Sequence, residues 1–453
     1  MRQVSRPRHP LRSPAPSALL LALPLAVAAC NDGNSQAARV LGPQSEFGGL
    51  AADPERHWFC VGDAATGQLV VVDGFDGSVR VDVPSTGIGI SGLHYDPCTR
   101  ALYAALSRRG RLQLLDAATL QLRNTLLVPE APFALASAPG GALLMVTGSG
   151  LLHFDPASQA RLTLLPAVAP DALLATSRDT TLGFAAETVA GATVVHRFDL
   201  TQLGAAPLDN SAAPLAGELV ALALDAVAGR LFVGTSSAPG LHILDAATLA
   251  VQETIDIGDG LTGMALNTTG LRLFWTTDAP LVESVIVEPR FEGPSVALSE
   301  PPRPRGLRLA DDNLTIAAWS SAGTLETAAV RSFWISAPAA FRQGTTGTMK
   351  LKGEANAAWF LLLSGEPAPL ILDRRNPGPD PRLLELSLSA GFQVAASGTF
   401  DANGDATLTD EIPTGLPDPV ELVFQAVQTQ SLVNRRYTLS NALAIRILGP
   451  ECQ

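Results

Sequence analysis

The sequence lacks the short motifs by which several enzyme classes are recognised. It contains no GxSxG nucleophile elbow, no phosphate-binding P-loop, no HExxH zinc motif and no dinucleotide-binding glycine fingerprint. Their absence lowers the expectation of an enzyme without excluding one. We therefore assign no catalytic residue, no metal ligand and no cofactor from the sequence.

Basic residues are also scarce. Lysine occurs only at Lys350 and Lys352, and 43 acidic residues outnumber 31 basic ones, for a formal net charge of −12. Residues 1–29 carry four arginines and no acid, so the chain without them has a charge of −16. Such an acidic body argues against nucleic acid as a partner and against a broad contact with anionic membranes.

Long apolar runs are absent except for "SALLLALPLAVAA" at 17–29, which follows four arginines at 2, 6, 8 and 12. Thirteen residues are too few to cross a bilayer as a helix, and Pro24 interrupts them. A basic leader followed by a short apolar run is typical of a secretory signal. We therefore expect residues 1–29 to be a signal peptide and the protein to be exported.

The signal ends in "LAVAAC", in which small residues precede Cys30. This ending resembles the bacterial lipoprotein signal, and the resemblance implies that Cys30 is lipidated and becomes the new N-terminus. Several acyl chains on one residue anchor a protein stably to a membrane. The expected location is the bacterial cell envelope, at the outer membrane or the cell surface. A plain cleavage site with an incidental Cys30 is the alternative.

Cysteine and histidine are rare, and no CxxC pair is present. In principle His57 with Cys60 and His94 with Cys98 supply the ligands of a zinc site. An exported chain meets an oxidising compartment, which favours a disulfide between Cys60 and Cys98 over thiolate ligands. Cys452 is left over near the end of the sequence.

A repeat of about 43 residues runs through the middle of the chain. "LQLLDAATLQLRNTL" at 112–126 recurs as "LHILDAATLAVQETI" at 241–255. The strand-then-acid segments of the series end at Asp73, Asp116, Asp155, Asp199, Asp245 and Glu288. A second series of apolar strands places a Leu or Met at 50, 93, 135, 173, 222, 264 and 307. Each period contains four short β-runs.

Four strands in each period of this length are typical of a propeller blade. The repeats resemble the YVTN and NHL-like β-propeller families, in which a strand ends in a similar Asp-Ala-Thr turn. The prediction is an all-β chain with a seven-bladed β-propeller at 46–335. Residues 30–45 form a tether in which "ARVLG" at 38–42 is able to supply a closing strand.

The repeated acid has two interpretations, turn formation and catalysis. An Asp at a strand end accepts hydrogen bonds from backbone N–H groups two or three residues later, and the Thr of "DAAT" is placed to join them. Acids that recur once per blade near the rim do not converge on one point. We therefore expect Asp116 and Asp245 to shape turns.

Binding residues are expected where loops enter the innermost strands, near the central channel. From the residues at or near those positions we select Ser91, Asp171, Glu218 and Arg305 as candidate binding residues. After residue 335 the period stops, and Pro- and Gly-bearing turns separate strands of mixed alternation, which predicts a small β-sandwich at 336–453.

Three functions fit these features. The first is a membrane-anchored binding or scaffold lipoprotein whose propeller face binds a protein, an envelope glycan or a small molecule. The second is a propeller hydrolase, similar to a lactonase, with a site near the channel mouth. The third is a purely structural envelope component. The fold alone does not choose among them.

Overall fold

The computed structural model describes most of the chain that follows residue 35. The described residues are 36–39, 47–53, 56, 58–74, 77–83, 89–96, 99–128, 130–176, 181–201, 209–210, 213–226, 228–257, 260–267, 272–287, 291–292, 295–309, 315–320, 322–329, 334–337, 340–353, 355–365, 367–371, 383–386, 393–416, 420–431 and 436–448. They form β-strands and two single 3-10 turns, Ser107–Arg109 and Pro139–Gly141, so the all-β prediction is confirmed. Nowhere in these ranges is there a helix long and apolar enough to cross a membrane. The predicted signal peptide and Cys30 lie outside the described residues.

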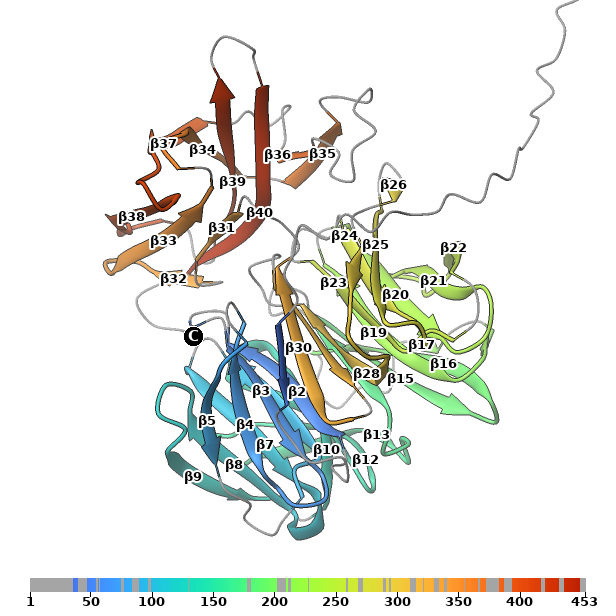
Figure 1. The fold of residues 1–453 in the computed structure, drawn as a ribbon. Helices are drawn as coiled ribbons and strands as arrows, with labels where there is room; N and C mark the ends of the chain where they lie inside the picture. The colour runs from blue at the N-terminus through green and yellow to red at the C-terminus, as the bar shows by residue number, and fades with distance from the viewer. Residues whose placement is uncertain are drawn as a thin grey trace, which may run out of the picture.

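Within the described part of 36–329, seven antiparallel sheets follow one another (Figure 1). Six of them contain four strands in meander order, and the seventh contains three such strands and β1; two sheets carry one further short strand. The sheets are, in chain order: β2 (Phe47–Asp53), β3 (Trp58–Asp63), β4 (Leu69–Asp73), β5 (Val79–Val83); β6 (Gly92–Asp96), β7 (Ala101–Leu106), β8 (Arg111–Asp116), β9 (Leu122–Leu127); β10 (Pro132–Ser137), β11 (Leu143–Thr147), β12 (Gly150–Phe154), β13 (Arg161–Pro166); β14 (Leu173–Thr176), β15 (Leu182–Val189), β16 (Ala192–Asp199), β17 (Asp209–Asn210) with β18 (Leu215–Ala216); β19 (Leu219–Asp225), β20 (Arg230–Thr235), β21 (Gly240–Asp245), β22 (Val251–Asp256); β23 (Gly263–Leu266), β24 (Arg272–Thr276), β25 (Leu281–Ile286), β26 (Phe291–Glu292) with β27 (Val296–Ala297); and β28 (Pro302–Leu309), β29 (Thr315–Ser320), β30 (Thr324–Ala329) with β1 (Gln36–Arg39).

The apolar residues of the second repeat series all lie in first strands. Leu50 lies in β2, Leu93 in β6, and the remaining five lie in β10, β14, β19, β23 and β28. These seven first strands contact one another in chain order, and β28 also contacts β2. The sheets therefore form a closed ring, hereafter the ring, with the first strands innermost.

Burial between neighbouring sheets explains why the ring forms. The second strands supply most of the largest fully buried side chains, among them Phe59, Phe184, Phe232, Phe274 and Trp319. Each of seven apolar clusters joins residues of two successive sheets, and one of them joins Trp319 of β29 to Phe59 of β3 across the closure. An apolar sheet face must be covered, and here each sheet is covered by its two neighbours.

The N-terminal part of the chain completes the last sheet. Strand β1 pairs antiparallel with β30, from Gln36 opposite Thr327 to Arg39 opposite Thr324. The predicted closing strand is therefore present, but it covers Gln36–Arg39 and not 38–42 as expected from "ARVLG"; residues 40–46 lie outside the described part. Pairing with β1 removes the free edge that β30 has on its own.

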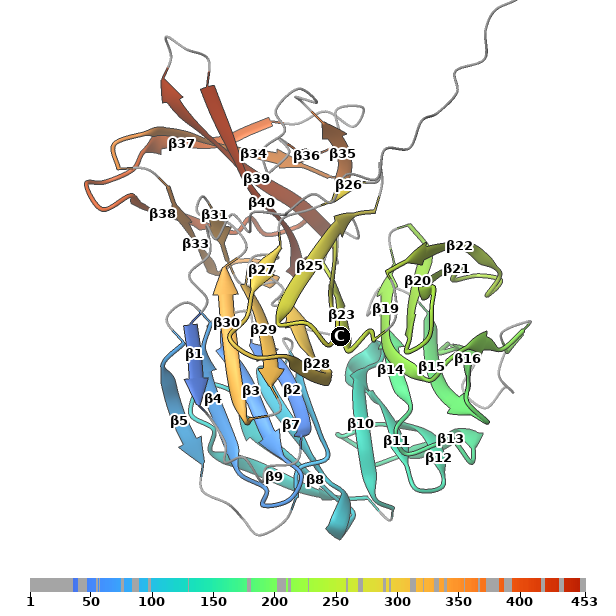
Figure 2. The same ribbon diagram turned by 45° about the vertical axis from the view of Figure 1, so that its right-hand side comes forward.

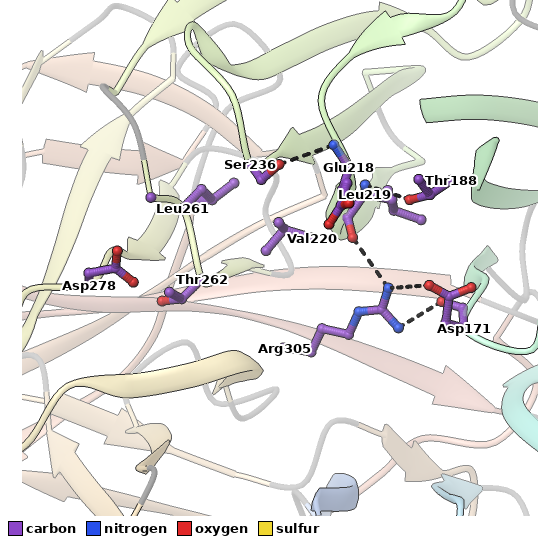
Figure 3. A pocket seen from close by; sticks show the side chains of 11 residues that line it. Asp171, Thr188, Glu218, Leu219, Val220, Ser236, Leu261, Thr262, Asp278 and Arg305 are labelled. Atoms are coloured by element: carbon purple, nitrogen blue, oxygen red, sulfur yellow. Dashed lines mark hydrogen bonds and ion pairs between the residues drawn. The ribbon is translucent and has the colours of Figure 1, made fainter. Parts of the chain in front are cut away.

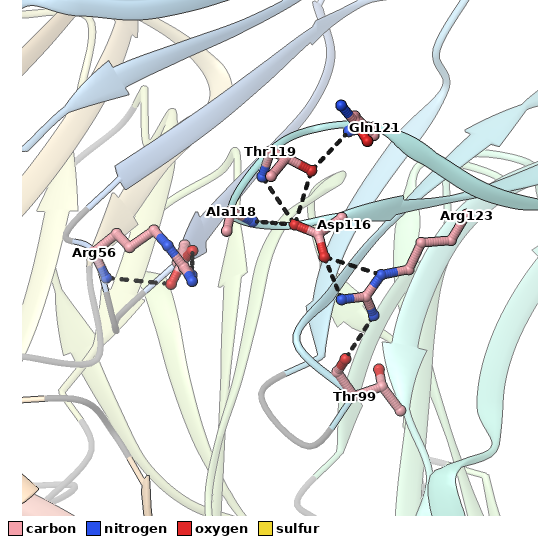
Figure 4. Close-up of polar contacts among 8 residues, drawn as sticks. Arg56, Thr99, Asp116, Ala118, Thr119, Gln121 and Arg123 are labelled. Atoms are coloured by element: carbon pink, nitrogen blue, oxygen red, sulfur yellow. Dashed lines mark hydrogen bonds and ion pairs between the residues drawn. The ribbon is translucent and has the colours of Figure 1, made fainter.

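The repeated acids form turns, as predicted. Asp116 Oδ1 accepts hydrogen bonds from Ala118 N (3.0 Å), Thr119 N (2.9 Å) and Thr119 Oγ1 (3.0 Å), while Arg123 binds Oδ2 (Figure 4). Hydrogen bonds from Arg123 and then from Thr119 lower the pKa of the Asp116 carboxyl. Both oxygens are thus engaged in holding the turn between β8 and β9.

The same turn recurs elsewhere in the ring. Asp245 Oδ1 accepts bonds from Ala247 N (2.9 Å), Thr248 N (2.8 Å) and Thr248 Oγ1 (2.9 Å). Asp155 and Asp199 also bind the backbone N–H two residues later, and Asp73 Oδ2 accepts a hydrogen bond from Arg80. Glu288, the sixth acid of the series, lies outside the described residues.

The strands after Ala329 form separate sheets with their own core. They are β31 (Trp334–Ser336), β32 (Ala340–Arg342), β33 (Thr346–Lys352), β34 (Ala358–Ser364), β35 (Pro367–Ile371), β36 (Leu383–Leu386), β37 (Gln393–Thr399), β38 (Asp405–Glu411), β39 (Val420–Ser431) and β40 (Arg436–Leu448). One sheet has the order β31-β33-β38 and another β32-β40-β39-β34-β37, with β35 and β36 paired apart. We call these strands the C-terminal sheets.

A single apolar cluster lies between the two larger C-terminal sheets. It contains Ile335 and Leu351 from one sheet and Leu361, Ala426 and Ile445 from the other. Because β31 pairs with β33, Trp334 and Ile335 belong here, so the C-terminal sheets begin slightly before the expected boundary at 335/336.

Closure by β1 generates a first prediction. Deletion of residues 36–39 exposes the edge of β30 and removes one strand's ladder, in which each backbone hydrogen bond contributes about 1 kcal/mol. We expect a loss of about 2–4 kcal/mol in the free energy of unfolding, measured by urea titration. The control deletes residues 31–34, which shortens the chain equally and should leave the unfolding midpoint unchanged. Equal midpoints for the two deletions would contradict a closing role for β1.

Candidate functional site

A pocket of about 640 Å³ opens where four sheets of the ring meet (Figure 3). It is lined from the entries to first strands and from the ends of second strands. These positions share one edge of the ring, because a second strand antiparallel to the first ends where the first begins. The lining residues are Asp171, Thr188, Glu218, Leu219, Val220, Ser236, Gly260, Leu261, Thr262, Asp278 and Arg305.

The pocket contains three of the four predicted binding residues. Asp171 lies before β14, Glu218 lies before β19 and Arg305 lies near the start of β28. They are far apart in the sequence, and the ring brings them together because each stands at the entry of an innermost strand.

Arg305 crosses the pocket and holds its wall. Its Nη1 donates to the Asp171 carbonyl oxygen (2.7 Å), its Nη2 donates to the Leu219 carbonyl oxygen (3.2 Å), and Nη2 lies 3.5 Å from Asp171 Oδ2. The Arg305 backbone N–H donates to the Thr262 carbonyl (2.6 Å). One residue of the last sheet is thereby tied to the three sheets that precede it.

The environment of Arg305 is unusual for an arginine. Burial lowers the pKa of its guanidinium, and the neighbouring Asp171 opposes this effect. Its backbone has φ of +64°, in the left-handed region that costs a non-glycine residue about 1–3 kcal/mol. Such a conformation persists where the surrounding contacts fix it, and here three carbonyl oxygens do so.

The pocket is acidic. Besides Asp171, the exposed carboxylates of Glu218 and Asp278 line it, and neither forms a hydrogen bond or an ion pair with another described residue. Glu218 is held through its backbone, whose N–H donates to Ser236 Oγ (3.1 Å). Three carboxylates against one guanidinium give the pocket an excess of negative charge.

The pocket acids do not form a metal centre. Across the described residues, no group of three His, Cys, Asp or Glu side chains has a geometry suited to a metal ion. Three of the predicted binding residues therefore converge in a polar pocket that has an excess of negative charge.

Ser91, the fourth predicted binding residue, is not in the pocket. Its hydroxyl donates to the carbonyl oxygen of Pro132 (2.6 Å) and lies 3.2 Å from that of Ala105, and its N–H donates to Ala105 O (2.8 Å). Pro132 belongs to the next sheet, so this serine joins two sheets. Ser91 occupies the position in its sheet that Asp171 occupies in another, but its side chain connects two sheets and does not line the pocket.

Cys60 is a free thiol, so the predicted Cys60–Cys98 disulfide is not formed in this structure. Cys60 lies in the middle of β3, packed in the apolar cluster between the first two sheets. Burial is the main cause of the strongly raised pKa of this thiol. Cys98 and Cys452 lie outside the described residues.

Two pocket residues, Ser236 and Asp278, were missed in the sequence. Both follow second strands, in "RLFVGTS" and "RLFWTTD", which are aligned members of the same repeat. Their place at the end of the aligned second strands could have identified them, because the end of a second strand lies on the same edge of the ring as the entry of a first strand.

The contacts of Arg305 predict its effect on stability. Arg305→Met keeps much of the side-chain volume but removes the hydrogen bonds to the carbonyl oxygens of Asp171 and Leu219, each of which contributes about 0.5–1.5 kcal/mol. We expect a corresponding loss in the free energy of unfolding, measured by urea titration. Arg109→Met, at an exposed arginine on the same edge of the ring, is the matched control and should change it by less than about 0.5 kcal/mol. The idea fails if the two variants unfold at the same midpoint.

Comparisons with known proteins identify the fold but not a family. No protein-family model matches the chain, and no curated protein matches its sequence. Among solved structures it is similar to a WD40 propeller chain from the "Crystal Structure of Mitotic Checkpoint Complex", at 16% sequence identity and a TM-score of 0.54. The match covers 72% of this chain and 99% of that one. Identity this low shows the fold alone, so the chain has a propeller-like all-β fold.

Proposed function

We propose that the protein is an exported lipoprotein, anchored through Cys30, whose ring is a seven-bladed β-propeller that works as a binding or scaffold module. The C-terminal sheets form a β-sandwich in this proposal. The anchor rests on the sequence, where an arginine-rich leader, a short apolar run and "LAVAAC" stand in order. The proposed location of the protein is the cell envelope, at the outer membrane or the cell surface.

One observation carries the binding function: three of the four residues chosen from their place in the repeat line one pocket. Pockets of roughly 300–1,000 Å³ with a few convergent polar groups are the usual form of a ligand site. The pocket volume of about 640 Å³ lies within that range.

Charge favours one class of ligand. Arg305 is engaged by Asp171 and by backbone carbonyls, so Glu218 and Asp278 are the groups left to receive a partner. Their carboxylates are acceptors, which suit an ammonium or a guanidinium group. We infer that the pocket receives a cationic group, such as a Lys or Arg side chain of a protein partner.

Other functions have weaker support. The solved structure with a similar fold comes from a protein complex, which agrees with a protein partner, although a shared fold does not transfer function. A lactonase-like hydrolase needs convergent metal ligands or an activated acid, and the described residues contain no such metal-binding group. Binding is therefore the function that we propose.

The pocket is tested by a pull-down from solubilised envelope membranes. The variant Glu218→Gln/Asp278→Asn removes both receiving charges and should lower recovery of the bound partner about tenfold, which corresponds to about 1.4 kcal/mol. The control Asp410→Asn/Glu411→Gln makes the same charge change on β38, in the C-terminal sheets. A partner recovered equally with both variants would place binding elsewhere, and no specific partner at all would favour the purely structural component.

The anchor is tested separately by labelling cells with a clickable fatty acid. The wild-type protein should carry the label and enter the membrane fraction, whereas Cys30→Ala should do neither, because the acylated thiol is then absent. Equal labelling of the two proteins would reject the lipoprotein proposal and leave the plain cleavage site.

A further inference from the structure

Strand direction places the two ends of β1 on opposite edges of the ring. β28, β29, β30 and β1 pair in that order, and every pair is antiparallel. Gln36 lies opposite Thr327, near the end of β30, and Arg39 lies opposite Thr324, at its start. The chain that precedes Gln36 therefore joins the ring at the edge where β30 ends.

The pocket lies on the other edge. β28 runs parallel to β30, because two antiparallel pairings separate them. Arg305 lies between Pro302, which pairs with Ser320 at the end of β29, and Leu307, which pairs with Ala318, so it is near the start of β28, on the edge opposite the end of β30. The turns at Asp116 and Asp245, between third and fourth strands, lie on the edge where β1 begins.

The distance from the proposed anchor to the ring is short. Six residue steps separate Cys30 from Gln36, which span at most about 20 Å when fully extended. β1 is also the outermost strand of its sheet, so this segment reaches the ring at its rim (Figure 2). For the pocket to face the bilayer, nearly all of that length would have to run back along the rim.

The C-terminal sheets join the ring on the same side. β30 ends at Ala329 and β31 begins at Trp334, so the link starts at the edge where β1 begins. Figures 1 and 2 show the C-terminal sheets on that side of the ring, beyond the tip of β30. Both chain connections of the ring thus leave from one side.

From these directions we infer an orientation on the membrane: the edge of the ring at which β1 starts lies nearer to the lipid bilayer than the edge that holds the pocket, and the pocket opens away from the bilayer. This inference rests on the proposed Cys30 anchor. It places the C-terminal sheets on the membrane side of the ring, and it presents the acidic pocket to partners outside the membrane layer.

Energy transfer to labelled lipid tests the orientation. The acylated protein is placed in vesicles that contain a rhodamine lipid, in a background with Cys98→Ser and Cys452→Ser. A donor dye is attached to one new cysteine at a time, in matched pairs from two sheets on either side of the closing sheet. Ala118→Cys and Ala247→Cys lie on the edge of the ring at which β1 starts, hereafter the tether edge. Arg109→Cys and Ser237→Cys lie on the edge that holds the pocket, hereafter the pocket edge. All four residues are exposed. The parent, whose buried Cys60 should stay unlabelled, is the blank.

In each pair we expect higher transfer from the tether-edge label. Two pairs separate orientation from tilt. A tilted ring changes the energy transfer from one sheet relative to the other, but within each pair the tether-edge label still gives the higher transfer. Equal or reversed transfer in both pairs would overturn the orientation while fatty-acid labelling at Cys30 still supported the anchor. Loss of that labelling would remove the anchor and the orientation with it.

Discussion

The structure depends on the fact that a small β-sheet has two apolar faces and no interior of its own. In this chain each sheet of the ring covers its neighbours, and the buried residues of the second strands, from Phe59 to Trp319, fill the seams. A row of such sheets has two bare ends unless it closes. Closure is therefore a requirement of burial, and the contact between β28 and β2 satisfies it.

Closure also creates the site. A single sheet presents only one first-strand entry, but a ring directs all the entries toward its centre. Asp171, Glu218 and Arg305 meet for this reason although they stand in different sheets. Arg305 adds a cross-connection, since its guanidinium and N–H engage carbonyl oxygens of three other sheets. The wall of the pocket is thus fixed by the same residue that gives it its one cation.

Sequence periodicity predicted the parts of the structure that repeat. The seven Leu and Met positions mark the first strands, and Asp116 and Asp245 form the expected turns because the residues that they bind are only two or three positions away. The entry positions of the repeat also pointed to Asp171, Glu218 and Arg305 as residues near the centre of the ring. These three residues line one pocket, because the ring makes equivalent positions converge.

What depended on a single contact was not predictable. Ser91 occupies an entry position, yet its hydroxyl is taken by Pro132 of the next sheet, which no pattern within one repeat reveals. The disulfide expected at Cys60 failed because the thiol points into an intersheet core, a matter of strand register that spacing between cysteines does not show. The residues of β1, Gln36–Arg39, differ from the expected 38–42 for a similar reason, since the strand that pairs with β1 is almost 300 residues away in the sequence.

That pairing has a consequence for how the molecule is made. Gln36 is synthesised before every other sheet residue of the ring, but its partner Thr327 is among the last. Closing so long a loop carries an entropic cost that later contacts must offset, and it makes formation of the final seam slow. Until then the chain exposes two bare apolar sheet faces, one at each end of the row, together with the unpaired edges of β30 and β1.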